Sequence, residues 1–96
     1  MKSKGIWFYG LSGVGKSYIS KLVHKHIRES VVVDGDLVRK LVSFDLKYGK
    51  SDREIQVKRV FGIAKLIIES KKYPVISTVW MNKEIIKKCA KANIAV

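Results

Sequence analysis

The sequence has few of the residues that stabilise secreted or membrane proteins. Its one cysteine, Cys89, cannot form an intramolecular disulfide and has no histidine or second cysteine beside it at metal-ligand spacing. The first apolar run, residues 5–9, is only about five residues long, which is too short for a signal peptide or a membrane span. We therefore expect a cytoplasmic protein with a reduced thiol and no membrane partner.

Acidic residues are scarce, with 8 Asp and Glu against 20 Lys and Arg and a net charge of +12. Such a charge attracts anions, including nucleotides, nucleic acids and lipid headgroups. The lysines are spread along the whole chain, which is typical of a solvated surface. The sequence also lacks the aromatic and basic interleaving, the zinc-knuckle spacing and the recognition-helix pattern of nucleic-acid-binding proteins. Charge alone therefore identifies no partner, and the pattern disfavours nucleic acid.

Short apolar runs alternate with stretches of helical period along the 96 residues. The expected strands are residues 5–9, 31–33, 73–79 and 94–96, and the expected helices are residues 17–29, 37–44, 51–71 and 83–92. Ser51 and Glu54 have the spacing of a capping box, and Asn82 is placed to cap the last helix. The alternation predicts an α/β fold with a parallel sheet and right-handed crossovers.

Residues 10–17, GLSGVGKS, match the pattern GxxxxGK[ST] without a mismatch, between an expected strand and an expected helix. The glycines let backbone N–H groups turn inward, and the helix start adds unpaired amides, so the segment can cradle a polyphosphate. We expect Lys16 to bridge the β- and γ-phosphates and the Ser17 hydroxyl to ligate Mg²⁺. The predicted nucleotide-binding residues are Gly10, Leu11, Ser12, Gly13, Val14, Gly15, Lys16 and Ser17.

The alternative for this segment is a chance glycine-rich turn with a helix cap, which both flanks argue against. The motif therefore predicts binding of a nucleoside triphosphate. It leaves open whether the γ-phosphoryl group passes to water, to a protein or to a small molecule.

Two carboxylates, Asp34 and Asp36, follow the expected strand of valines. In open α/β sheets the chemistry lies outside the carboxyl ends of the strands. One carboxylate can therefore hold a metal-bound water, and the other can accept a proton from an attacking hydroxyl. The alternative is an Asx turn that caps the next helix, which Asp36 alone would satisfy.

Arg39 lies one helical turn after Asp36, so both side chains are expected on the same side of the helix. A guanidinium there can bind an anionic group of an acceptor. Only four of the 20 basic residues are arginine, and Arg53 is another of them. For Arg53 the alternative, an exposed residue in the first turn of a helix, stays open.

Three motifs, GLSGVGKS, DGDLVR at 34–39 and DLKYGKSDREIQVKR at 45–59, resemble in order and spacing those of the adenylylsulfate kinase family. The likeness extends through residues 62–66 and covers roughly residues 5–80. Members of this family use ATP to phosphorylate the 3′-hydroxyl of adenosine 5′-phosphosulfate (APS). The resemblance implies a P-loop NTPase fold with three α/β/α layers, ATP and Mg²⁺ as cofactors, and a magnesium site that includes Ser17 and Asp34.

Position by position, the resemblance implies Lys16 and Asp36 as catalytic residues, with Asp36 as the base. Arg39 and Arg53 would bind the phosphosulfate of the acceptor, and Tyr48 takes the place of a phenylalanine that stacks on the acceptor's base. The implied substrate-binding residues are Asp34, Asp36, Arg39, Tyr48, Arg53 and Gln56.

The departures from the family pattern lie on the acceptor side. Lys47 replaces a glycine, Gly49 a serine and Gln56 an asparagine, and residues 78–82 lack the family's proline and arginine. An intact donor motif beside an altered acceptor motif suggests a kinase for another nucleotide, for which cytidine diphosphoramidate in capsule biosynthesis is a precedent.

The basic lid and the later strands of the family have no counterpart in this sequence. We therefore expect residues 1–96 to form a single, apparently truncated P-loop kinase domain. Three functions stay open: an adenylylsulfate kinase, a kinase for another nucleotide, and a non-catalytic ATP-binding remnant. A homodimer also stays open.

Overall fold

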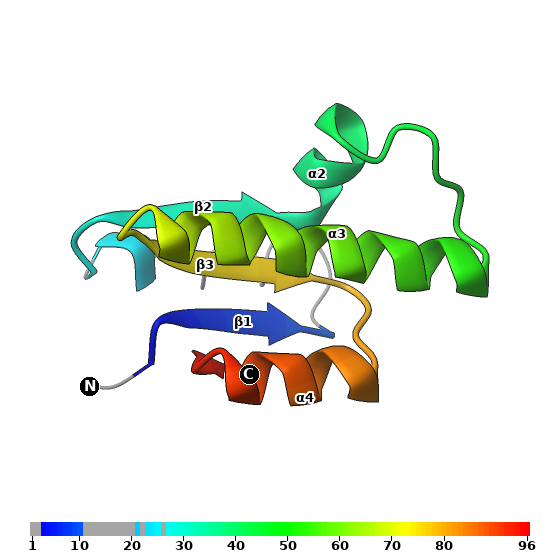
Figure 1. Ribbon diagram of the computed structural model, residues 1–96. Helices are drawn as coiled ribbons and strands as arrows, with labels where there is room; N and C mark the ends of the chain where they lie inside the picture. Colours follow the sequence, from blue (N-terminus) through cyan, green and yellow to red (C-terminus); the bar gives the residue numbers. More distant parts are fainter. Residues whose placement is uncertain (1–2, 11–20, 22, 26) are drawn as a thin grey trace.

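A four-stranded parallel sheet forms the centre of the computed structural model, which describes residues 3–10, 21, 23–25 and 27–96 (Figure 1). The strands are β1 (Gly5–Tyr9), β2 (Ser30–Asp34), β3 (Tyr73–Thr78) and β4 (Ile94–Ala95). The helices are α2 (Gly35–Leu41), α3 (Lys50–Glu69) and α4 (Lys83–Lys91). Of the expected helix over 17–29, residues 17–20, 22 and 26 lie outside the described residues, and residues 21 and 23–25 are helical. The expected end at Glu29 is wrong, because residues 27–29 form a bend and a turn in which Glu29 has a φ of 59°.

The strand order is β2-β3-β1-β4, and each neighbouring pair is parallel. Trp7 lies opposite Ile76 between β1 and β3, and Val33 lies opposite the same residue between β2 and β3. The predicted α/β class with a parallel sheet is therefore confirmed. Because the strands are parallel, the carboxyl ends of β1, β2 and β3 meet at one edge of the sheet (Figure 1).

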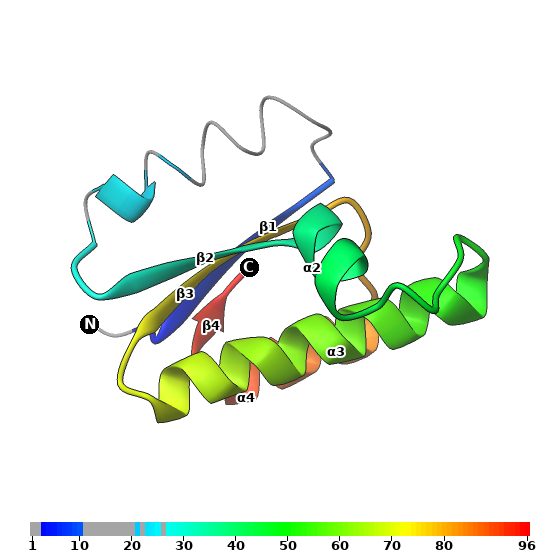
Figure 2. The ribbon, with the colours of Figure 1, turned by 90° about the horizontal axis from the view of Figure 1, so that it is seen from above.

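Helices α3 and α4 cover one face of the sheet, and the described helical residues 23–25 lie on the other face (Figure 2). The core lies mainly between the sheet and the α3–α4 layer. Its most deeply buried side chains are Trp7, Val57, Val60, Ala64, Ile76, Ile85 and Cys89. The apolar stripes of α3 and α4 thus pack as their helical periods predict.

Helix α2 differs from the sequence-based expectation at both ends, and it begins at Gly35 rather than at Leu37. Helix α2 ends at Leu41 rather than at Phe44, because the amides of Val42 and Ser43 both bond to the Val38 carbonyl and close the helix. Phe44 is left 78% exposed in the following turn.

The capping box that Ser51 and Glu54 suggested is wrong. Helix α3 begins at Lys50, and its N-cap residue, Gly49, makes no side-chain cap bond. The expected cap of α4 is confirmed, because Asn82 Oδ1 accepts a hydrogen bond from the Ile85 amide at 2.8 Å.

Candidate functional site

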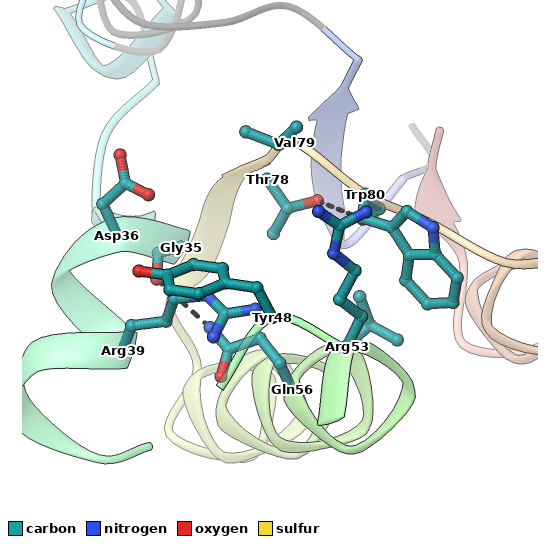
Figure 3. Close-up of a pocket in the computed structure, with 10 residues that line it drawn as sticks. Gly35, Asp36, Arg39, Tyr48, Arg53, Gln56, Thr78, Val79 and Trp80 are labelled. Atoms are coloured by element: carbon teal, nitrogen blue, oxygen red, sulfur yellow. Dashed lines mark hydrogen bonds between the residues drawn. The ribbon is translucent and has the colours of Figure 1, made fainter. Parts of the chain in front are cut away.

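A pocket of about 230 Å³ opens at the carboxyl edge of the sheet, between α2, the loop before α3, the start of α3 and the end of β3 (Figure 3). Of the six substrate-binding residues that the sequence predicts, all but Asp34 line it. They are Asp36, Arg39, Tyr48, Arg53 and Gln56. The fold therefore gathers in one cavity the side chains that two separate motifs supplied.

Asp34 and Asp36 have different places at the start of α2. Asp34 is the N-cap residue, and its Oδ1 accepts a hydrogen bond from the Asp36 amide at 3.1 Å. The alternative reading, in which Asp36 caps the helix, is therefore wrong, because Asp34 makes the cap. Because Asp34 caps the helix, the Asp36 carboxylate remains exposed on the pocket wall.

The loop that carries Tyr48 is held to α3 by two acidic side chains. Asp45 accepts two hydrogen bonds from the Arg59 guanidinium, at 2.7 and 3.1 Å, and Asp52 Oδ2 accepts one from the Lys47 amide at 2.7 Å. The guanidinium beside it lowers the pKa of Asp45, and the carboxylate raises the pKa of Arg59. These bonds hold two loop residues, Asp45 and Lys47, in place beside Tyr48, which is 70% exposed.

Arg39 stacks on this loop from the side of α2. Its guanidinium carbon lies 4.5 Å from the centre of the Tyr48 ring, and its Nη1 donates to the Lys47 carbonyl at 3.0 Å. A guanidinium has five N–H donors, so others remain for an anionic ligand. Arg39 is thus positioned by the protein before any ligand binds.

Gln56 closes the floor of the pocket. It is only 5% exposed, and its Nε2 donates to the Gly35 carbonyl at 3.1 Å (Figure 3). Among the described residues, its Oε1 is buried without a hydrogen-bond partner. The carbonyl of Gly35 requires a donor, which fixes the orientation of the amide. The contact joins the start of α3 to the start of α2.

The end of β3 supplies a wall that the sequence analysis did not assign to the site. Thr78, Val79 and Trp80 line the pocket. The sequence showed only that this segment departs from the family pattern, and its position after a central strand was the signal that could have identified it. Trp7 Nε1 donates to Thr78 Oγ1 at 2.8 Å, and Thr78 Oγ1 donates to the Trp80 carbonyl at 2.9 Å.

Gly10, the first residue of the predicted nucleotide loop, lies beside this wall. Its amide is shared between the carbonyls of Thr78 and Val79, each at 3.2 Å, and its φ of 89° is a conformation that favours glycine. The other predicted nucleotide-binding residues lie outside the described residues, so their roles stay predictions. They are Leu11, Ser12, Gly13, Val14, Gly15, Lys16 and Ser17.

Of the two residues of the implied magnesium site, Asp34 is described and Ser17 lies outside the described residues. Asp34 and Asp36 offer carboxylates at the strand edge, and Mg²⁺ binds proteins through one or two carboxylates while keeping several waters. In the described part of the chain, no group of three or more His, Cys, Asp or Glu residues could hold a metal ion by itself. The donor set therefore fits a magnesium ion that is also bound by phosphate and water.

None of the described helices combines the length and the apolarity needed to cross a membrane.

Known proteins with similar sequences are adenylyl-sulfate kinases. A family model described as adenylylsulphate kinase matches residues 2–94. The adenylyl-sulfate kinase of Halothermothrix orenii is 34% identical over 73 residues, which cover 72% of this chain and 40% of that protein. That of Gloeothece citriformis is 33% identical over 91 residues, which cover 88% of this chain and 52% of that protein. The chain thus spans about half, or less, of the length of these relatives.

Solved structures of the same family have this fold. The APS kinase of Mycobacterium tuberculosis, in complex with AMPPNP and APS, has a TM-score of 0.73 and 31% identity, covering 98% of this chain and 59% of that chain. A hexameric APS kinase from Thiobacillus denitrificans has a TM-score of 0.77 at 22% identity, covering 99% of this chain and 21% of that chain. At that identity the second likeness concerns the fold alone.

Proposed function

Because this chain belongs to the adenylylsulphate kinase family, we propose that residues 1–96 form a P-loop kinase domain that transfers the γ-phosphoryl group of ATP to a nucleotide hydroxyl, with APS as the first candidate acceptor. The observation that carries this proposal is the pocket that gathers Asp36, Arg39, Tyr48, Arg53 and Gln56 next to Gly10. The relative solved with AMPPNP and APS supports both kinds of nucleotide.

The acceptor binds through its charge and its base. Arg39 and Arg53 line the pocket and bind the phosphosulfate, for which the fork of a guanidinium is well suited. The exposed ring of Tyr48 stacks on the base. These contacts orient the acceptor's hydroxyl toward the edge where Asp36 and Gly10 lie.

In the transfer step, the acceptor's hydroxyl oxygen forms a bond to the γ-phosphorus, and the bond between that phosphorus and the leaving ADP oxygen breaks. The exposed carboxylate of Asp36 takes the hydroxyl proton. Lys16 and the loop amides hold the phosphates, and Ser17 and Asp34 would hold Mg²⁺. When bound, this ion neutralises charge on the β- and γ-phosphate oxygens.

A second candidate acceptor is cytidine diphosphoramidate. The pocket supports this candidate, because Gln56 on the floor replaces an asparagine of the family pattern, and the wall belongs to residues 78–82, which lack the family's proline and arginine. These side chains contact the acceptor rather than ATP, so their replacement would change the acceptor and leave the donor unchanged.

The test is an acceptor panel with radiolabelled ATP and Mg²⁺, with Lys16→Ala as the control that removes phosphate binding. Transfer to APS supports the first candidate, and transfer to cytidine diphosphoramidate without transfer to APS supports the second. Binding of ATP that is lost in Lys16→Ala, without transfer to any acceptor, would instead show a non-catalytic ATP-binding protein and overturn the kinase proposal.

A further inference from the structure

We propose that Thr78 is a positioning residue whose side chain holds the Trp80 wall of the acceptor pocket in place. The inference rests on the proposed function, because it concerns the pocket in which the acceptor would bind. It adds a residue with no assigned role, at the point where β1, the start of α2 and the segment after β3 meet.

The hydroxyl of Thr78 makes two hydrogen bonds, one as acceptor and one as donor. Indole nitrogen can only donate, so Thr78 Oγ1 accepts from Trp7 Nε1 at 2.8 Å. The single hydroxyl proton is then free to be donated to the Trp80 carbonyl, 2.9 Å away. Trp7 is 1% exposed and Thr78 is 5% exposed, so water cannot readily replace the bond between them. The hydroxyl therefore links β1 to the pocket wall.

The methyl group of Thr78 has a neighbour of its own. A Cβ atom placed on Gly35 would lie 3.1 Å from Thr78 Cγ2 and 3.1 Å from the Ser77 carbonyl. The methyl group thus lies close against the first residue of α2, whose carbonyl also accepts the Gln56 hydrogen bond. Because both substituents of a β-branched carbon are engaged, the side chain has one favourable rotamer.

The predicted nucleotide-binding loop contacts the same segment through backbone atoms of its first residue, Gly10. The Gly10 amide bonds to the backbone carbonyls of Thr78 and Val79, and no side chain takes part. A change in the Thr78 side chain would release Trp80 and leave this backbone contact intact. The arrangement therefore predicts that loss of the hydroxyl weakens acceptor binding and not ATP binding.

Two substitutions separate the roles of the hydroxyl and the methyl group. Thr78→Val keeps the branched shape but removes the hydroxyl, which leaves the Trp7 N–H and the Trp80 carbonyl unpaired. Thr78→Ser keeps the hydroxyl. Ser77→Ala is the matched control, because Ser77 is also buried but points to the opposite face of β3 and does not line the pocket.

The first measurement does not depend on any ligand. The sequence has two tryptophans, so protein labelled with 5-fluorotryptophan gives two ¹⁹F resonances, which Trp80→Phe assigns. We expect the Trp80 resonance to shift and sharpen in Thr78→Val, as the released wall becomes mobile, and to stay in place in Thr78→Ser and Ser77→Ala. An unchanged Trp80 resonance in a folded Thr78→Val protein would overturn the inference.

The second measurement is calorimetric titration with APS, with cytidine diphosphoramidate and with AMPPNP plus Mg²⁺. We expect Thr78→Val to raise the Kd of the bound acceptor about fivefold to tenfold, with the Kd of AMPPNP unchanged and Thr78→Ser close to wild type. An equal loss for acceptor and AMPPNP, or an equal loss in Ser77→Ala, would show a merely structural role and overturn the inference. If wild-type protein binds none of these nucleotides, the proposed function fails, and the ¹⁹F result alone decides whether Thr78 holds Trp80.

Discussion

Arg39 and Tyr48, from a helix and a loop that meet only in the folded protein, stack with 4.5 Å between the guanidinium carbon and the ring centre. A cation over an aromatic face contributes about 0.5–1 kcal/mol at an exposed site. The pair is also tied by the bond from Arg39 Nη1 to the Lys47 carbonyl. Anion-binding and base-stacking groups of the proposed acceptor pocket are therefore preorganised as one unit.

Replacing the Tyr48 ring tests its proposed role in stacking. Tyr48→Leu removes the aromatic face, and we expect it to weaken binding of the nucleotide acceptor about fivefold, from the loss of an aromatic pair. Tyr48→Phe keeps the face and serves as the control, with affinity close to that of wild type. Calorimetric titration with APS and with cytidine diphosphoramidate measures the effect. A Leu variant that binds the acceptor as tightly as wild type would contradict the stacking role.

The Asp45–Arg59 ion pair should make the loop sensitive to acid. The Arg59 guanidinium lowers the pKa of Asp45 below its ordinary value of 3.8. A carboxyl group with a lowered pKa stabilises the folded state above the unfolded-state pKa, and this contribution is lost as the pH falls through the lower folded-state value. Wild-type protein is therefore expected to lose stability more steeply than Asp45→Asn as the pH falls below about 3.8.

Urea unfolding of both proteins between neutral pH and acid measures this difference. The pair is exposed, so added salt should reduce the difference between wild type and variant at neutral pH. Arg59→Gln should reproduce the behaviour of Asp45→Asn, since either change removes the same pair. Parallel pH profiles for wild type and Asp45→Asn would show that the pair contributes nothing to stability.

The sheet and most of its strands were predictable because apolar runs of β-branched and aromatic residues are a local signal. The pairing of Gly5–Tyr9 with Tyr73–Thr78, which places β3 between β1 and β2, does not follow from the alternation of strands and helices alone. The helix starts were harder, because several polar residues can compete for one cap. Asp34 caps α2, where Asp36 was the alternative reading, and α3 begins at Lys50 after Gly49 rather than after a Ser51 cap.

The candidate site was predictable where a motif places its residues, as for Asp36, Arg39 and Arg53. The wall formed by Thr78 and Trp80 was not, because it depends on hydrogen bonds to Trp7 more than seventy residues away in the sequence. Such long-range contacts leave no local pattern. Only the fold shows that a strand end, a helix start and a loop share one cavity.

The hydrogen bond between Gln56 and Gly35 allows a prediction about the stability of the fold. Gln56→Leu removes the hydrogen bond from Gln56 Nε2 to the Gly35 carbonyl, so we expect a loss of about 0.5–1.5 kcal/mol in the free energy of unfolding. Gln56→Glu places a carboxylate beside that carbonyl and should cost at least as much at neutral pH. Urea unfolding of the three proteins gives the values. Stability equal to wild type in the Leu variant would show that the bond to Gly35 contributes little.

Cys89 is buried in the core between α4 and the sheet, and burial raises the pKa of its thiol to about 11. Since the thiolate is the reactive form, we expect the native protein to react with a disulfide reagent at pH 8 far more slowly than the urea-unfolded protein does. The raised pKa means that the folded state keeps its thiol proton where the unfolded state, with an ordinary value of 9.0, loses it. Stability should therefore fall between about pH 9 and pH 11 through this group.

Cys89→Ala removes the thiol, and with it the thiol's contribution to the loss of folding stability at alkaline pH. All other ionisable groups are common to both proteins, so the difference between the two pH profiles isolates the cysteine. The variant should be less stable than wild type at neutral pH, because it leaves a small cavity in the buried core. The gap between the two proteins should then narrow as the pH rises. Fast labelling of the native thiol, or a gap that stays constant to pH 11, would show that Cys89 is not enclosed as the structure has it.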